Sequence, residues 1–114
     1  MLGIFLYLQL IQNLKDMQTL KQVLESMPKL YSTENQKVKD VKITFVIPGT
    51  RWLWHIVEAR QEGENDFLLF GYCHSGLGDD CSEWGYVMFS QLVEVCALPV
   101  VQKNLKIDMN GRAL

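Results

Sequence analysis

The chain has 114 residues, of which 48% are hydrophobic and 21% are charged, and its formal net charge is −2 at pH 7. This composition is typical of one globular domain and excludes an intrinsically disordered chain, which would carry fewer aliphatic and aromatic residues. The nearly neutral charge provides no overall attraction to nucleic acid or to a membrane surface.

The first predicted element is an amphipathic helix over residues 4–26. Pro28 disfavours helical backbone at the residue before it, so the helix is predicted to end near Ser26. Apolar side chains recur at three- and four-residue steps, which is the helical period: Leu10, Leu14, Met17, Leu20 and Leu24.

The residues before Met17 need a separate interpretation because they form an apolar run. The run lacks a positively charged start and a small-residue cleavage site, and it is too short to span a membrane. We predict an apolar N-terminal extension over residues 1–16, which continues the first helix and offers a surface for a homodimer. Residues 17–114 are predicted to form a single α+β domain.

From residue 41 the apolar pattern changes to a period of two, which predicts strands separated by short polar connections. Ser90 is the expected N-cap of a short helix over residues 91–96, and Pro99 lies at the start of the last strand. Short connections favour antiparallel neighbours. The predicted fold class is therefore α+β, an antiparallel β-meander of about five strands with an N-terminal helix and one short C-terminal helix covering one face. The predicted strands are 41–47, 52–60, 67–73, 83–89 and 98–107.

Several short blocks of the sequence follow one another in a characteristic order: MPKLYSTE (27–34), WLW (52–54), FGY (70–72), EWGYVMFSQL (83–92) and LPV (98–100). In this order and spacing they resemble a small bacterial family known as Domain of Unknown Function 2958. The resemblance extends over about residues 17–107. It implies a compact single-domain protein of bacteria, often encoded on plasmids, phages or other mobile elements, with no assigned activity. The loop 73–82 departs from the family pattern because it is longer than in typical members.

That loop contains residues that can ligate metals or react. The chain has three cysteines, an odd number that favours reduced thiols in the cytoplasm. Cys73, His74 and Cys81 do not match a structural zinc site, because such sites use closely spaced pairs and because neighbouring strand residues point to opposite faces. The alternative, in an oxidising compartment, is a disulfide between Cys73 and Cys81. We predict a turn, with no metal and no cofactor.

Acidic residues are concentrated in the middle of the chain. Residues 58–83 hold seven acidic residues and one basic residue, a balance of −6. They form either a solvated surface or a patch that attracts a basic protein surface.

Five aromatic residues lie on strands that are predicted to be neighbours. They form either part of the core or an exposed patch. The leading hypothesis is a protein-binding domain rather than an enzyme, which the resemblance extends to an accessory or defence-modulating protein of a mobile element. The predicted binding residues are Trp52, Trp54, Tyr72, Asp79, Asp80, Glu83, Trp84 and Tyr86.

Two alternatives come from other functional classes. The first is an enzyme with a pocket around His55, Glu58 and Tyr72, although the sequence has neither a nucleophile motif nor a phosphate-binding loop. The second is nucleic-acid binding, which the acidic middle of the chain disfavours. It would use the basic residues Lys29, Lys37, Lys39, Lys42 and Arg51.

Overall fold

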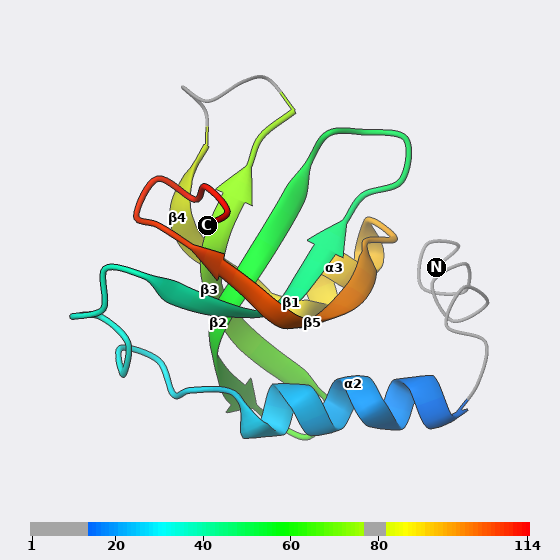
Figure 1. The fold of residues 1–114 in the computed structure, drawn as a ribbon. Helices are drawn as coiled ribbons and strands as arrows, with labels where there is room; N and C mark the ends of the chain where they lie inside the picture. Colours follow the sequence, from blue (N-terminus) through cyan, green and yellow to red (C-terminus); the bar gives the residue numbers. More distant parts are fainter. Residues whose placement is uncertain (1–13, 77–81) are drawn as a thin grey trace.

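The computed structural model describes residues 14–76 and 82–114 (Figure 1). The predictions for residues 1–13, which include the homodimer surface, and those for Asp79, Asp80 and Cys81 lie outside the described residues. The predicted α+β fold class is confirmed. In chain order the elements are α2 (Leu14–Ser26), β1 (Lys39–Val46), β2 (Leu53–Glu62), β3 (Asp66–His74), β4 (Glu83–Met88), α3 (Phe89–Glu94) and β5 (Leu98–Ile107).

The five strands form one antiparallel sheet in the spatial order β4-β3-β2-β1-β5. Strands β1 to β4 follow one another as a meander. Helix α3 then carries the chain back across the sheet, so that β5 pairs with β1 and not with β4 (Figure 1). Pro99 lies at the start of an edge strand, where its missing N–H removes no essential ladder bond.

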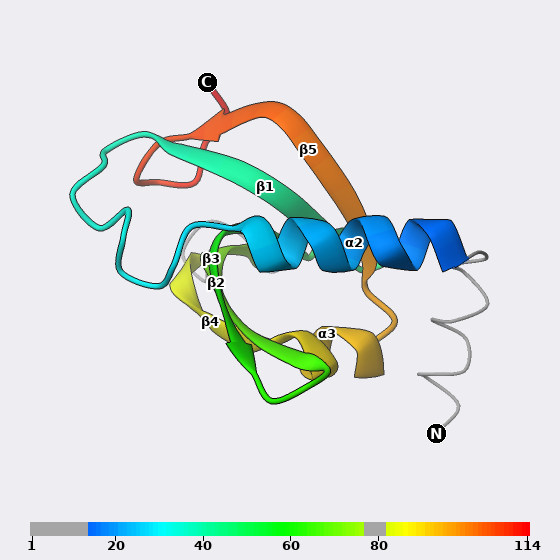
Figure 2. The same ribbon diagram turned by 90° about the horizontal axis from the view of Figure 1, so that it is seen from below.

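The main hydrophobic core lies between the sheet and its two helices. Helix α2 ends at Ser26, as the proline two residues later predicts. It contacts β2 and β5, whereas α3 contacts β3 and β4 (Figure 2). We call this side of the sheet the helix face. Its buried core comprises Leu20, Leu24, Met27, Ile43, Phe45, Ile56, Ala59, Phe67, Leu69, Leu92 and Ala97.

The start of α3 corrects one prediction, because Ser90 is not its N-cap. The N-cap is Met88, and its backbone N–H donates to the Gln91 side chain over 2.9 Å. Ser90 lies inside the helix and donates from its N–H and its hydroxyl to the Asp66 carboxylate, at 3.0 and 2.7 Å. The Ser90 hydroxyl therefore bonds to the Asp66 carboxylate of β3, because a carboxylate is a stronger acceptor than a neutral group.

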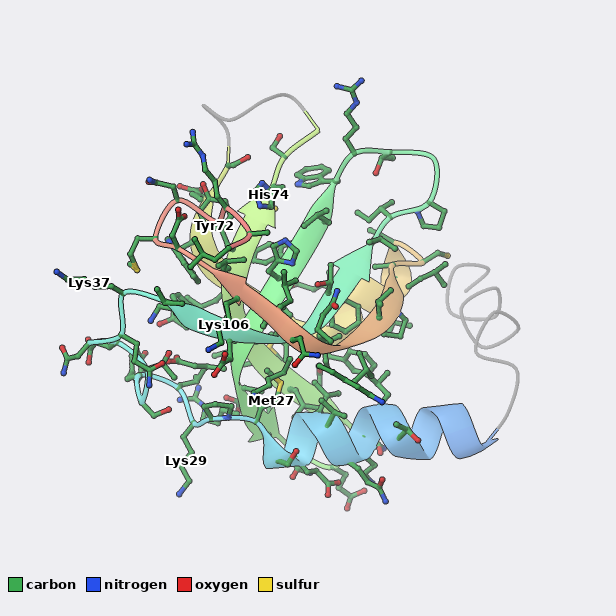
Figure 3. The ribbon with its side chains drawn as sticks, in the orientation of Figure 1. Met27, Lys29, Lys37, Tyr72, His74 and Lys106 are labelled. Atoms are coloured by element: carbon green, nitrogen blue, oxygen red, sulfur yellow. The ribbon has the colours of Figure 1, made fainter. Side chains whose placement is uncertain are left out.

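A smaller cluster lies on the opposite side of the sheet, which we call the second face. It consists of Val41, Val57, Tyr72 and Ile107. The turn at residues 108–112 lies against it, beside Tyr72 and His74 (Figure 3). His74 Nε2 lies 2.8 Å from the Gly111 carbonyl oxygen, so the C-terminal turn is bonded to β3.

Candidate functional site

A β-bulge in β2 determines where Glu58 lies. Ile56 and Glu58 are paired with consecutive residues of β3, so Val57 is an extra residue between them. Ile56 and Ala59 both belong to the helix face, whereas Val57 belongs to the cluster on the second face. The bulge therefore brings Glu58 to the second face beside Val57, as bulges near binding sites commonly do.

A second shift in register separates the two ends of β1. It falls between Val41, which belongs to the second face, and Ile43, which belongs to the helix face. Lys39, at the start of β1, is only 3% exposed, and its Nζ lies 5.7 Å from the centroid of the Trp84 ring. This geometry is a cation–π contact. Lys39 and Glu58 thus reach the same region from different strands.

Glu58 shapes the loop that follows α2. The loop lies beside β2, where the Ala59 N–H donates to the Pro28 carbonyl over 3.0 Å. Glu58 is 2% exposed, and each of its carboxylate oxygens accepts a backbone N–H over 2.8 Å, from Tyr31 at Oε1 and from Thr33 at Oε2. Tyr31 has a φ of 70°, a left-handed conformation that a bulky residue adopts only when its surroundings impose it.

Thr33 connects the two buried charges. Its hydroxyl donates to Glu58 Oε2, and Lys39 Nζ donates to its carbonyl oxygen and lies 3.3 Å from its Oγ1. Each charge is therefore hydrogen-bonded, which burial requires. An ammonium has three donors and a carboxylate about four acceptor sites. After these bonds, Lys39 retains a donor and Glu58 retains an acceptor.

Above this network lies a cleft of ≈ 250 Å³, which we call the aromatic cleft. The Phe70 and Trp84 rings stack with centroids 5.5 Å apart, and Tyr86 contacts Phe70 at 5.0 Å. Tyr31 and Tyr86 are 60% and 47% exposed, and their centroids lie 6.4 Å apart at the mouth. The residues lining the cleft are Tyr31, Glu34, Lys39, Glu58, Phe70, Trp84, Tyr86 and Met109.

Tyr86, at the mouth of the aromatic cleft, has a raised pKa. The pKa of Tyr86 is raised first by a hydrogen bond to the Tyr31 side chain, then by burial, and further by the charges of Tyr31, Glu58 and Glu34. Negative charges raise a phenol pKa because they oppose the formation of phenolate. The two carboxylates therefore act on Tyr86, one of the two rings at the mouth.

The structure divides the predicted aromatic residues between the two faces. Trp84 and Tyr86 line the aromatic cleft, and Tyr72 is buried beside Trp84 with ring centroids 5.2 Å apart. Trp54 packs against the core of the helix face. Trp52 is 45% exposed, and its indole N–H donates to the thiol of Cys73, the residue paired with Trp54. The five residues thus do not form one patch.

The acidic residues predicted for binding are placed only in part. Glu83 is exposed at the start of β4, the strand that carries Trp84 and Tyr86. Asp79 and Asp80 lie outside the described residues. Of the three acidic residues predicted for binding, the structure therefore describes Glu83 alone.

The aromatic cleft does not bring together the three residues of the enzyme hypothesis. Glu58 lines the aromatic cleft, but His55 and Tyr72 are not among its lining residues. His55 Nδ1 lies 2.9 Å from the Thr44 hydroxyl, and its ring contacts His74 edge to face at 5.3 Å. Burial, and then the charge of His74, lowers the pKa of His55 to about 4. His55 is therefore a neutral, packed histidine at pH 7.

Cys73, one of the two described cysteines, is not activated. Burial raises the pKa of the Cys73 thiol, and the charge of Glu83 raises it further, against the opposite effect of the hydrogen bond from Trp52. Cys73 is a free thiol. Within residues 14–76 and 82–114, no three His, Cys, Asp or Glu side chains form a group that could hold a metal ion. The raised pKa of Cys73 disfavours the thiolate, which is the reactive form of a cysteine.

The basic residues predicted for nucleic-acid binding are scattered. Lys29 and Lys37 are exposed and extend away from the molecule at different points of the loop after α2 (Figure 3). Arg51 is also exposed, and Lys42 is half-buried. Lys39 corrects the prediction, because its ammonium is buried against Thr33 and Trp84 and is not on the surface.

Sequence reasoning missed half of the residues that line the aromatic cleft. Tyr31 and Glu34 lie in a polar loop without periodicity, but both fall in the block MPKLYSTE, which carries part of the family resemblance. Phe70 was predicted as a strand residue and lies in the block FGY, but it was not proposed for binding, and Met109 follows the last strand. A block that belongs to no helix or strand was the signal available for the first two, because such blocks are more often functional than structural.

Comparisons with known proteins do not assign the chain to a family. No protein-family model matches it, and neither a curated protein sequence nor a solved structure is significantly similar to it. The resemblance to Domain of Unknown Function 2958 therefore stays a prediction. Across residues 14–76 and 82–114, none of the helices has the length and apolar character that crossing a bilayer requires.

Proposed function

We propose that the chain is a binding domain that engages a protein partner through the aromatic cleft and the acidic residues next to it. The observation that carries the proposal is the pair of exposed rings, Tyr31 and Tyr86, above a buried and hydrogen-bonded Lys39–Thr33–Glu58 network. Rigid aromatic residues around a small pocket are the usual centre of a protein interface.

The size of the cleft supports a protein partner over a free small molecule. Its volume of ≈ 250 Å³ lies below the range of about 300–1,000 Å³ that is usual for small-molecule sites. A space of this size accommodates one side chain, which the partner would insert as an anchor.

The left-handed backbone of Tyr31 supports the same site. Strained residues cluster at binding and catalytic sites, where the surrounding structure holds them in place. Glu58 holds Tyr31 through a hydrogen bond to its backbone N–H, which fixes one side of the cleft before a partner arrives. A preformed site loses less conformational entropy on binding.

The biological setting is part of the proposal. By its resemblance to Domain of Unknown Function 2958, we infer an accessory or defence-modulating protein of a bacterial mobile element. The odd number of cysteines supports a reducing, cytoplasmic location. Exposed Glu34 and Glu83 would speed the encounter with a basic partner, and this contribution would weaken at high salt.

Site-specific photocrosslinking in host cells tests the proposal. Tyr86→p-benzoylphenylalanine places the crosslinker at the mouth of the cleft, and Trp52→p-benzoylphenylalanine is the control, because Trp52 has nearly the same exposed fraction but lies on the other side of the sheet. We expect one protein to be crosslinked from position 86 and not from position 52. Crosslinking from position 52 alone would reject the aromatic cleft as the binding site.

A further inference from the structure

We infer that the aromatic cleft binds a positively charged side chain of the partner, the guanidinium of an arginine. The inference rests on the proposed function and names the chemical group that the partner presents. It is carried by three features of the cleft: its charge balance, the arrangement of its rings, and the hydrogen-bonding capacity left at its floor.

The charge balance of the cleft favours a cation. Its lining contains two carboxylates, Glu34 and Glu58, and one ammonium, Lys39. Lys39 and Glu58 are joined through Thr33, so these two buried charges offset each other. The exposed carboxylate of Glu34 is then the unbalanced charge of the lining. The pKa of Tyr86 is raised first by its hydrogen bond to Tyr31, and both carboxylates raise it further because they oppose a phenolate at the mouth.

The rings favour a guanidinium over an ammonium. The Trp84 ring already holds one cation, the Lys39 ammonium at 5.7 Å. The tilted rings of Tyr31 and Tyr86, 58° apart, present a second aromatic surface at the mouth. A planar guanidinium stacks on such rings and donates several hydrogen bonds in its own plane, whereas a compact ammonium keeps more of its water.

The floor of the cleft offers an acceptor to the arriving group. Glu58 Oε1 accepts one hydrogen bond, from the Tyr31 N–H, while Oε2 accepts two from Thr33. A carboxylate oxygen accommodates about two hydrogen bonds, so Oε1 has room for one donor. A guanidinium can donate one N–H to Glu58 while its plane stacks on the tyrosine rings at the mouth. A compact ammonium does not combine these two contacts as well.

A nucleobase is the other planar group that stacks on exposed aromatic rings. Sites for single-stranded nucleic acid combine such rings with a positively charged groove that follows the phosphates. Here the described basic residues are scattered, and the exposed charge in the lining of the cleft, Glu34, is negative. The observations therefore favour a protein side chain.

NMR titration of the isotope-labelled full chain tests the inference. The probes are a blocked Gly-Arg-Gly peptide, the same peptide with citrulline in place of arginine, the lysine peptide, and a single-stranded oligonucleotide. The indole N–H of Trp84, which donates to the Met109 carbonyl, is the reporter inside the cleft. We expect saturable shifts with the arginine peptide, weaker binding of the lysine peptide and none of citrulline, which has the shape of arginine without its charge.

Two variants localise the effect. Tyr86→Ala should weaken arginine binding by roughly 2- to 30-fold, the range of a cation–π contact from exposed to desolvated. Glu34→Gln keeps every ring and removes the unbalanced charge, so it should also weaken binding. Trp52→Ala, on the other side of the sheet, should leave the affinity unchanged.

The results separate this inference from the proposed function. No saturation by the arginine peptide, or equal affinity for citrulline, overturns the arginine inference. Saturation by the oligonucleotide alone also overturns it. If position 86 still crosslinks a protein in cells, the binding function stands while the arginine inference falls. If position 86 crosslinks nothing, the proposed function falls by its own test.

Discussion

Lys39 and Glu58 are buried on neighbouring parts of the second face and contact the same residue, Thr33. Glu58 accepts from the N–H and the hydroxyl of Thr33, and Lys39 donates to its carbonyl oxygen. A buried charge that loses its partner destabilises a protein strongly. The loop that carries Tyr31 is therefore held to the sheet by charged hydrogen bonds and not by hydrophobic packing alone.

Glu58→Gln is expected to destabilise the fold by about 3 kcal/mol. The amide group puts an NH₂ where an oxygen accepts hydrogen bonds, so at least one N–H of the loop loses its acceptor. Glu62→Gln is the matched control, because the Glu62 side chain is still 39% exposed and pairs with Arg60, and it should cost less than about 1 kcal/mol. Denaturant unfolding measures both. Equal losses would show that Glu58 does not hold the loop.

Tyr31→Gly and Tyr31→Ala separate the backbone of Tyr31 from its ring. Glycine adopts a φ of 70° freely, so the glycine variant should be more stable than the alanine variant by about 1 kcal/mol. At Tyr86, in strand β4, the order should be reversed, because glycine weakens a strand. Thermal unfolding of the four variants checks this. The same order at both positions would contradict a strained Tyr31.

Gly111→Ala is expected to displace the C-terminal turn. A Cβ at Gly111 would lie 2.2–2.6 Å from atoms of the Tyr72 ring, and Tyr72 is itself buried. Gly63 has a similar φ, +76° against +73°, but no atom within 4 Å of the added Cβ. Gly63→Ala should therefore cost about 1 kcal/mol from backbone strain, and Gly111→Ala a further 1–3 kcal/mol, roughly, from overpacking.

Unfolding free energies of the two glycine variants, together with the chemical shift of the Trp84 indole N–H, test this expectation. The indole donates to Met109 in the same turn, so it should shift in the Gly111 variant alone. Similar stability of both variants, with an unmoved indole signal, would mean that Tyr72 and the turn are not in close contact.

His55 should make stability depend on pH. Its folded-state pKa of about 4 lies below its ordinary 6.5, because burial opposes its charge. The unfolded chain therefore binds the proton first as the pH falls, so the stability present above pH 6.5 is lost progressively toward pH 4. The loss should be about 1 kcal/mol, since the ring is partly exposed and solvent screens its charge.

NMR titration of the His55 ring, and unfolding of the wild type and His55→Gln across this range, measure the effect. The variant should lose less stability than the wild type between pH 6.5 and pH 4. A His55 titration midpoint near 6.5, or parallel pH profiles of the two proteins, would contradict a packed, neutral histidine.

The sheet was predictable from the sequence because its strands follow local patterns. Alternating apolar residues and short polar connections located β1 to β4, and Pro28 located the end of α2. The position of β5 was not predictable in the same way. Its pairing with β1 depends on contacts between residues far apart in the chain, and local periodicity does not indicate such contacts.

The candidate site was predictable only where it follows the strand pattern. Trp84 and Tyr86 alternate on β4 and were identified, but an uninterrupted period of two places Glu58 on the same face as Ile56. The bulge at Val57 reverses this assignment, and nothing in the local sequence marks it. Lys39 was expected on the surface because lysine is rarely buried without a partner, and its partner Thr33 comes from a loop.

The most direct test of the aromatic cleft as a binding site is the dissociation constant of the crosslinked partner, measured calorimetrically for the wild type, Tyr86→Ala and Trp52→Ala at matched thermal stability. We predict that Tyr86→Ala weakens binding by more than about tenfold, as loss of a central interface ring does, while Trp52→Ala leaves the constant unchanged. An unchanged constant for Tyr86→Ala, with weakening only for Trp52→Ala, would place the partner on the other side of the sheet and reject the aromatic cleft as the binding site.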